Sequence, residues 1–130
     1  MYKSLAEEYN WQYGYTELGT PRLVAKSRSG DITIEFYDNI LDFYIPPAII
    51  ENSTTIRLGS IKARILKPED YLVLKARAGR SKDIDDLKKI SKLVPKKLRL
   101  DQRRIKKNIE LFDPEDQRVI KRILSDIGLI

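Results

Sequence analysis

Residues 64–87 read RILKPEDYLVLKARAGRSKDIDDL, and this stretch decides how the chain is organised. It begins at the end of an apolar–polar alternation, which is typical of a strand. Pro68 is followed by two acids, and this order favours a helix start, because proline fits the first helical position and acids stabilise a helix N-terminus. Gly79 ends that helix, and Ser81 or Asp83 caps the next one. The stretch predicts a strand, a helix, a glycine turn and a second helix.

The chain before this stretch is predicted to be mainly β, after a short N-terminal helix. Apolar and polar residues alternate over 32–36, directly after a Ser29-Gly30-Asp31 turn signal, and this is the pattern of a hairpin. A second hairpin is predicted around Gly59-Ser60. The first half therefore contains short strands joined by tight turns.

The chain after this stretch is predicted to be helical. The second helix stops before Pro95, a third begins at Asp101 and a fourth at Asp113. A length of 130 residues corresponds to one domain. We expect an α+β fold with a small mixed or antiparallel sheet. Residues 1–66 are mainly β with an N-terminal helix, and residues 67–130 are helical and basic.

Four charged residues surround the predicted glycine turn: Lys75, Arg80, Asp83 and Asp86. Two cations beside the acidic start of a helix indicate an ion-pair network that fixes the angle between the two helices.

The composition excludes several kinds of chemistry. The chain contains no Cys and no His, so disulfides, thiolate zinc sites and Ser-His-Asp hydrolysis are ruled out. Any metal must be held by oxygen ligands, which favours Mg²⁺ or Mn²⁺. Apolar runs are far shorter than the roughly 20 residues of a membrane span, and the N-terminal sequence is not that of a signal peptide. We expect a cytoplasmic protein, and the high charge with abundant Ile and Lys would suit a thermophile.

The positive charge is concentrated in one segment. The chain has 25 Lys and Arg against 19 Asp and Glu, a net charge of +6. Ten of the cations lie between residues 88 and 107: Lys88, Lys89, Lys92, Lys96, Lys97, Arg99, Arg103, Arg104, Lys106 and Lys107. This basic segment could bind nucleic acid. The lack of interleaved aromatic residues favours a solvated helical surface instead.

The central stretch resembles a known family. Pro68-Glu69-Asp70-Tyr71, then Ala78-Gly79-Arg80-Ser81-Lys82-Asp83 and Asp86, are similar to the signature of nucleotidyltransferase-like proteins of the abortive-infection toxin type. Upstream, residues 30–36 resemble the strand that carries the third catalytic carboxylate of that family. The resemblance covers roughly residues 20–90.

The resemblance implies nucleotidyl transfer, and it also implies that two of the three catalytic carboxylates are missing from this sequence. Such enzymes transfer a nucleotide with two Mg²⁺ ions held by three carboxylates, two of them on an Asp-x-Asp strand after a Gly-Ser turn. By resemblance, Glu35 is the third carboxylate, a metal ligand only if a partner supplies the others. In a completed site, Lys75 and Arg80 would orient a phosphate or the turn beneath it. No Gly-Ser or Gly-Gly turn with an Asp-x-Asp or Asp-x-Glu strand precedes it. Asp31 and Asp38 do not complete a two-metal site with Glu35.

Two functions follow from these observations. The first is a nucleotidyltransferase-like protein that is incomplete and inactive alone, one half of a split enzyme or a toxin–antitoxin component. It would bind no cofactor alone, and Mg²⁺ once a partner completes the site. The second is a non-catalytic nucleic-acid- or protein-binding module that uses the basic segment. A sheet edge left unpaired by missing strands would also favour a homo-oligomer or a complementing chain.

Overall fold

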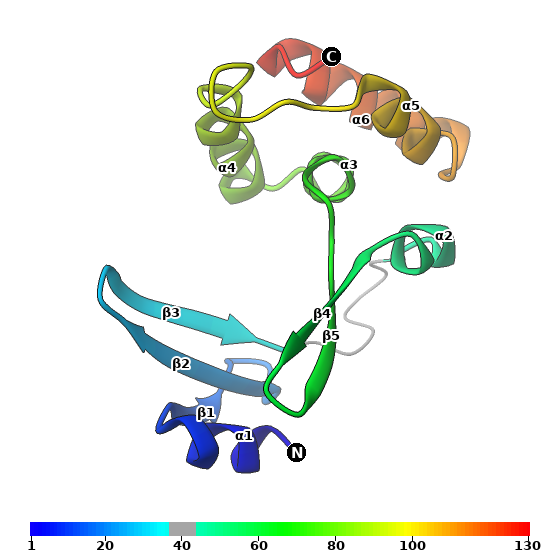
Figure 1. Cartoon of the computed structure of the whole chain (residues 1–130). Helices are drawn as coiled ribbons and strands as arrows, with labels where there is room; N and C mark the ends of the chain where they lie inside the picture. Colours follow the sequence, from blue (N-terminus) through cyan, green and yellow to red (C-terminus); the bar gives the residue numbers. More distant parts are fainter. Residues whose placement is uncertain (37–43) are drawn as a thin grey trace. The chain divides into compact units, whose positions relative to one another are not determined.

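The structure is a computed structural model, and it describes residues 1–36 and 44–130. The described chain divides into two compact units, Met1–Phe43 and Tyr44–Ile130; below they are called the β unit and the helical unit. Figure 1 shows the strands and helices that form each unit. The described residues thus have the α+β composition expected from the sequence, with antiparallel strands first and helices last.

The β unit is a helix and a three-stranded antiparallel sheet. Its elements are α1 (Tyr2–Tyr9), β1 (Gln12–Tyr15), β2 (Pro21–Ser27) and β3 (Gly30–Glu35), and the strand order is β1-β2-β3. The predicted turn lies between β2 and β3. Strand β1 was not expected, because Gly14 reads as a helix breaker rather than as a strand residue. Pairing with β2 forms this strand.

The sheet of the β unit has one covered face and one polar face. Along β2, Leu23 and Ala25 are buried, whereas Arg22 and Lys26 are exposed. Helix α1 packs against β1 and β2 (Figure 1), and its Ala6 is buried. Since side chains alternate between the faces of a strand, Arg22 and Lys26 belong to the polar face.

The helical unit begins with a short helix and a hairpin. Its elements are α2 (Pro47–Glu51), β4 (Thr54–Leu58), β5 (Ile61–Ile65), α3 (Pro68–Ala78), α4 (Ser81–Ser91), α5 (Gln102–Ile109) and α6 (Pro114–Ile127). The hairpin β4–β5 is a separate two-stranded antiparallel sheet. The strands therefore form two small sheets rather than one.

Helix α3 lies at the centre of the helical unit. It packs against α4, α5 and α6, and its Leu72, Val73 and Ala76 are fully buried. Its apolar residues leave little polar surface, and burial removes that apolar area from water. Gly79 follows α3 with a φ of 62°, a conformation that a glycine adopts without strain. The sequence predicted both ends of this helix correctly.

The start of α4 differs from the prediction. Arg80 is the residue that precedes the first helical turn, and Ser81 already lies within the helix. The backbone N–H of Arg80 donates to the Asp83 carboxylate at 3.2 Å. Asp83 stabilises the helix start from the third helical position and therefore is not the cap residue itself.

Candidate functional site

Glu35, the residue that the family resemblance singles out, is exposed at the end of β3. Pairing places Glu35 directly opposite Arg22 of β2, and Thr33 opposite Val24. Side chains of directly paired residues share a face of the sheet, so Glu35 and Arg22 both lie on the polar face. β3 is an edge strand of the described sheet.

The described carboxylates of this face do not form a metal site. Asp31 shares the face with Glu35, but four residues along a strand correspond to about 13 Å. Asp38 lies outside the described residues. Within 1–36 and 44–130, no three acidic side chains gather closely enough to hold a metal ion. Residues 1–36 and 44–130 therefore do not fit a two-metal centre by themselves.

The charged residues at the turn between α3 and α4 come together as a network. The ammonium of Lys75 donates to Asp83 at 2.9 Å and to Asp86 at 3.0 Å, and Nε of Arg80 donates to Asp83 at 2.8 Å. The Asp83 side chain is only 1% exposed, whereas that of Arg80 is 76% exposed. This geometry favours the turn-organising role for these four residues. Their role toward phosphate stays a prediction.

The pKa values in this network reflect the pairing. Burial raises the pKa of Asp83, but hydrogen bonds from Arg80 and Lys75 outweigh it and lower that pKa to about 2. Burial lowers the pKa of Lys75, and its hydrogen bonds to Asp83 and Asp86 shift it upward overall. The hydrogen bond from Lys75 also lowers the pKa of Asp86. All three groups are therefore charged at neutral pH.

A second network ties α3 to α5. The carboxylate of Asp70 is fully buried and accepts hydrogen bonds from Arg104 Nε at 2.7 Å, Arg104 Nη2 at 2.8 Å and Asn108 at 2.6 Å. Burial raises the pKa of Asp70, and the hydrogen bonds from Arg104 and Asn108 lower it overall. Arg104 also donates to the carbonyl of Asn52 at 3.2 Å. This network connects α2, α3 and α5.

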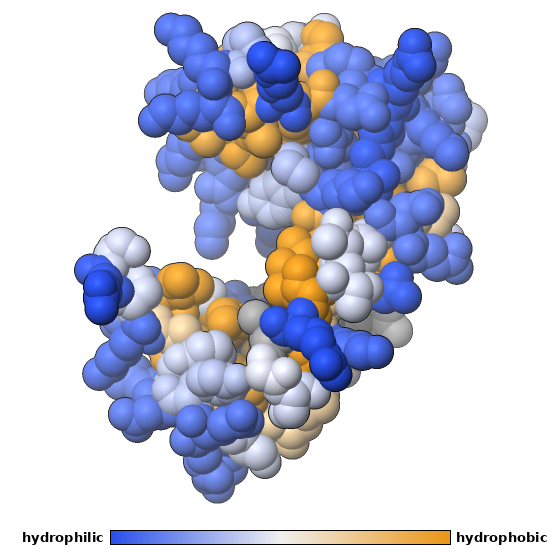
Figure 2. Space-filling view, viewed as in Figure 1, coloured by the Kyte–Doolittle hydropathy of each residue, from blue (hydrophilic) through white to orange (hydrophobic). Residues whose placement is uncertain are grey.

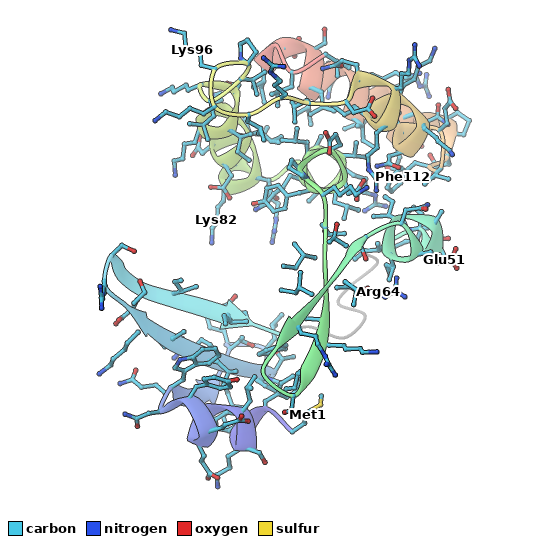
Figure 3. The ribbon with its side chains drawn as sticks, viewed as in Figure 1. Met1, Glu51, Arg64, Lys82, Lys96 and Phe112 are labelled. Carbon is cyan, nitrogen blue, oxygen red and sulfur yellow. The ribbon has the colours of Figure 1, made fainter. Side chains whose placement is uncertain are left out.

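This second network changes the interpretation of the basic segment. Arg104 belongs to the predicted set of ten cations, but its side chain is only 20% exposed and its guanidinium is bound by Asp70. The other nine cations are exposed. In Figure 2, hydrophilic side chains cover much of the helical unit, and Figure 3 shows Lys96 projecting from the loop after α4. The exposed basic surface thus consists of nine residues without Arg104.

Sequence reasoning also missed Arg22 on the polar face. Nothing in the residues around it distinguishes it from the other arginines. Only the strand register shows that it lies between Gly14 of β1 and Glu35 of β3.

Comparison with protein families agrees with this picture of a small α+β nucleotidyltransferase-like domain. The family described as "Nucleotidyl transferase of unknown function (DUF2204)" matches residues 1–126, and the chain belongs to this family. Comparison with curated proteins and with solved structures gives no match. No helix in the described part of the chain is long and apolar enough to cross a membrane.

Proposed function

We propose that this chain is a nucleotidyltransferase-like component that is inactive alone and that a second chain completes, as a split enzyme or a toxin–antitoxin component. The observation that carries the proposal is that no group of three acidic residues able to hold a metal ion exists among residues 1–36 and 44–130. Glu35 lies on the polar face of the sheet. The family match supports the nucleotidyltransferase-like character.

The chemistry of nucleotidyl transfer explains why a single carboxylate is insufficient. Displacement at a phosphate needs two divalent ions that stabilise the attacking and leaving oxygens. Mg²⁺ takes oxygen ligands in near-octahedral geometry, so Glu35 could be one ligand among several. The remaining carboxylates would come from a partner that carries a Gly-Ser turn and an Asp-x-Asp strand.

The edge strand β3 offers a way for such a partner to bind. β3 pairs with β2 on one side, and the structure gives it no other strand partner among the described residues. Ile32 on this strand is 55% exposed. An exposed edge with apolar side chains is a template for a further strand. A strand added there would lie next to Glu35, and the same edge could pair two copies of the chain.

Transfer of labelled nucleotide from each of the four ribonucleoside triphosphates, with Mg²⁺ present, tests this proposal. We expect no transfer by the purified chain. We expect transfer when a neighbouring gene product with the Gly-Ser and Asp-x-Asp strands is added, and loss of that transfer in Glu35→Gln. Asp31→Asn is the matched control on the same strand and should keep the restored activity. Transfer by the chain alone that survives Glu35→Gln would overturn the proposal.

A second candidate function rests on the nine exposed cations of the basic segment. Such a surface can bind nucleic-acid phosphates, with an affinity that falls steeply as salt rises. Fluorescence anisotropy with a single-stranded RNA at 50 and 200 mM salt measures this. Lys96→Glu combined with Lys97→Glu should abolish binding, whereas Lys121→Glu combined with Arg122→Glu on α6 should have a smaller effect. Equal losses from both pairs would indicate nonspecific attraction and not a binding site.

A further inference from the structure

Three residues form one row across the polar face of the β unit. The register pairs Gly14 of β1 with Arg22 of β2, and Arg22 with Glu35 of β3. Directly paired residues lie about 5 Å apart at their Cα atoms. Arg22 therefore stands between a residue without a side chain and a carboxylate.

A hollow of about 340 Å³ lies beside Arg22. It is lined by Gln12, Tyr13, Gly14, Arg22 and Val24. A Cβ atom placed on Gly14 would lie 3.8 Å from Nη2 of Arg22, so the guanidinium reaches over the glycine. The missing side chain keeps the hollow open, and its volume falls within the range of small-ligand sites.

Arg22 forms no ion pair and no side-chain hydrogen bond with any residue in 1–36 or 44–130, in contrast to three arginines of the helical unit. Arg77, Arg80 and Arg104 each bind an aspartate at 3.0 Å or less. Among the described residues that line the hollow, Arg22 is the charged one. The hollow therefore presents the positive charge of Arg22, and the Glu35 carboxylate on the neighbouring strand lies outside its lining.

We propose that this hollow binds a phosphate group, with Arg22 as its main ligand. A guanidinium donates two parallel hydrogen bonds to phosphate oxygens, and this bidentate geometry makes Arg a preferred phosphate ligand. The amide of Gln12 offers a further donor. The assignment of this phosphate to a nucleotide rests on the proposed function. It belongs either to a nucleoside triphosphate or to the end of an acceptor nucleic acid.

The position of Glu35 fits such a site in a nucleotidyl transfer enzyme. On neighbouring strands of one face, a carboxylate can bind a metal ion while a guanidinium beside it binds a phosphate. Without a metal ion, the negative charge of Glu35 opposes an anion at Arg22. This opposition gives a way to separate the two proposals.

Isothermal titration with inorganic triphosphate, in the presence of EDTA, tests the site without any metal ion. We expect binding by the full chain and at least tenfold weaker binding by Arg22→Met. Arg28→Met, in the turn after β2, removes the same charge outside the hollow and should change affinity less than twofold. Gly14→Val keeps every charge but fills the hollow, and it should also weaken binding at least tenfold.

The two sources of phosphate are distinguished by the ligand. Tighter binding of triphosphate than of a 5′-phosphorylated oligonucleotide, both dependent on Arg22, assigns the nucleotide. The reverse order assigns the acceptor end. Binding of neither ligand overturns the site, as does binding that Arg22→Met and Gly14→Val leave unchanged while amide spectra show both variants folded.

Glu35→Gln separates this site from the proposed function. In EDTA the variant should bind triphosphate a few-fold more tightly, because a neighbouring negative charge is removed. If Arg22-dependent binding is found but no partner ever restores transfer, the phosphate site stands and the proposed function fails. If transfer is restored and Arg22→Met leaves both binding and KM unchanged, the phosphate site fails and the proposed function stands.

Discussion

The helical unit and the polar face of the β unit use charged residues in different ways. In the helical unit, the buried carboxylates of Glu69, Asp70 and Asp83 all accept hydrogen bonds at 2.6–3.4 Å. On the polar face, Glu35 and Arg22 are both exposed. A buried charge must be paired, because desolvation is costly. An exposed charge need not be paired inside the protein, so it is the better candidate for binding a ligand.

Burial and pairing therefore distinguish the charged residues that stabilise the fold from those that are candidates for binding a ligand. The family-like motif residues Asp70 and Asp83 hold helices together in the structure, through Arg104 and Lys75. These contacts show a role in folding, and a role of the turn residues toward phosphate stays a prediction. The candidate binding residues Arg22 and Glu35 lie upstream, on strands β2 and β3, where the sequence carries a weaker signal.

The largest effect is expected where the pairing is most buried. Arg104→Met leaves the Asp70 carboxylate buried with Asn108 as its remaining side-chain donor, and removing one partner of such a pair costs about 3–5 kcal/mol. Arg103→Met removes the neighbouring exposed cation and should change stability by less than about 0.5 kcal/mol. Urea unfolding followed by circular dichroism measures both. Equal effects from the two variants would show that Asp70 does not depend on Arg104.

A smaller effect is expected at the turn between α3 and α4. Lys75→Met removes two ion pairs and leaves Asp83 with the exposed Arg80. When a buried group loses a hydrogen-bond partner, the free energy of unfolding falls by about 1–3 kcal/mol. Lys82→Met, on the exposed start of α4, is the matched control and should cost less than about 0.5 kcal/mol. A loss of the same size in Lys82→Met would show that general charge balance, not pairing, stabilises the turn.

Acid should weaken the helical unit in a defined range of pH. The folded pKa of Asp83 is about 2, below its ordinary value of 3.8, and that of Asp70 is also lowered. A lowered carboxylate pKa contributes stability above the ordinary value, and this stability is lost as pH falls through the folded value. For Asp83 the loss between about pH 4 and 2 is roughly 2 kcal/mol.

Urea unfolding at pH 5.5, 3.5 and 2.5 measures this dependence. Asp83→Asn cannot titrate at this position, so its stability should fall less over the same range. An identical fall in the wild type and in Asp83→Asn would assign the acid sensitivity to other groups.

The sequence predicted local structure better than long-range pairing. Pro68 and Gly79 marked both ends of α3, because proline and glycine act through the backbone of their own turn. Strand β1 was missed because it forms by pairing with β2, and the residues of β1 do not indicate this pairing. Register and pairing are set by tertiary packing, which overrides local preference.

The same limit applies to the candidate site. The charges near Gly79 could be grouped from the sequence, because they lie within twelve residues of one another. Arg104 and Asp70 are 34 residues apart, and a basic run gives no sign that one of its cations is bound. The spacing of Arg104 and Asn108, four residues apart on one helix face, was the available signal. Arg22 gave none, because only the strand register places it beside Glu35.

The smallest effect on stability is expected on the polar face. Arg22→Met and Glu35→Gln alter exposed side chains of the β unit, so each should change the free energy of unfolding by less than about 0.5 kcal/mol. Thermal unfolding followed by the tyrosine and tryptophan signals of the β unit measures this. If either variant loses as much stability as Lys75→Met, then Arg22 and Glu35 form a stabilising pair like the ion pairs of the helical unit. If Arg22→Met loses phosphate binding but keeps its stability, Arg22 binds phosphate and does not stabilise the fold, unlike the paired charges of the helical unit.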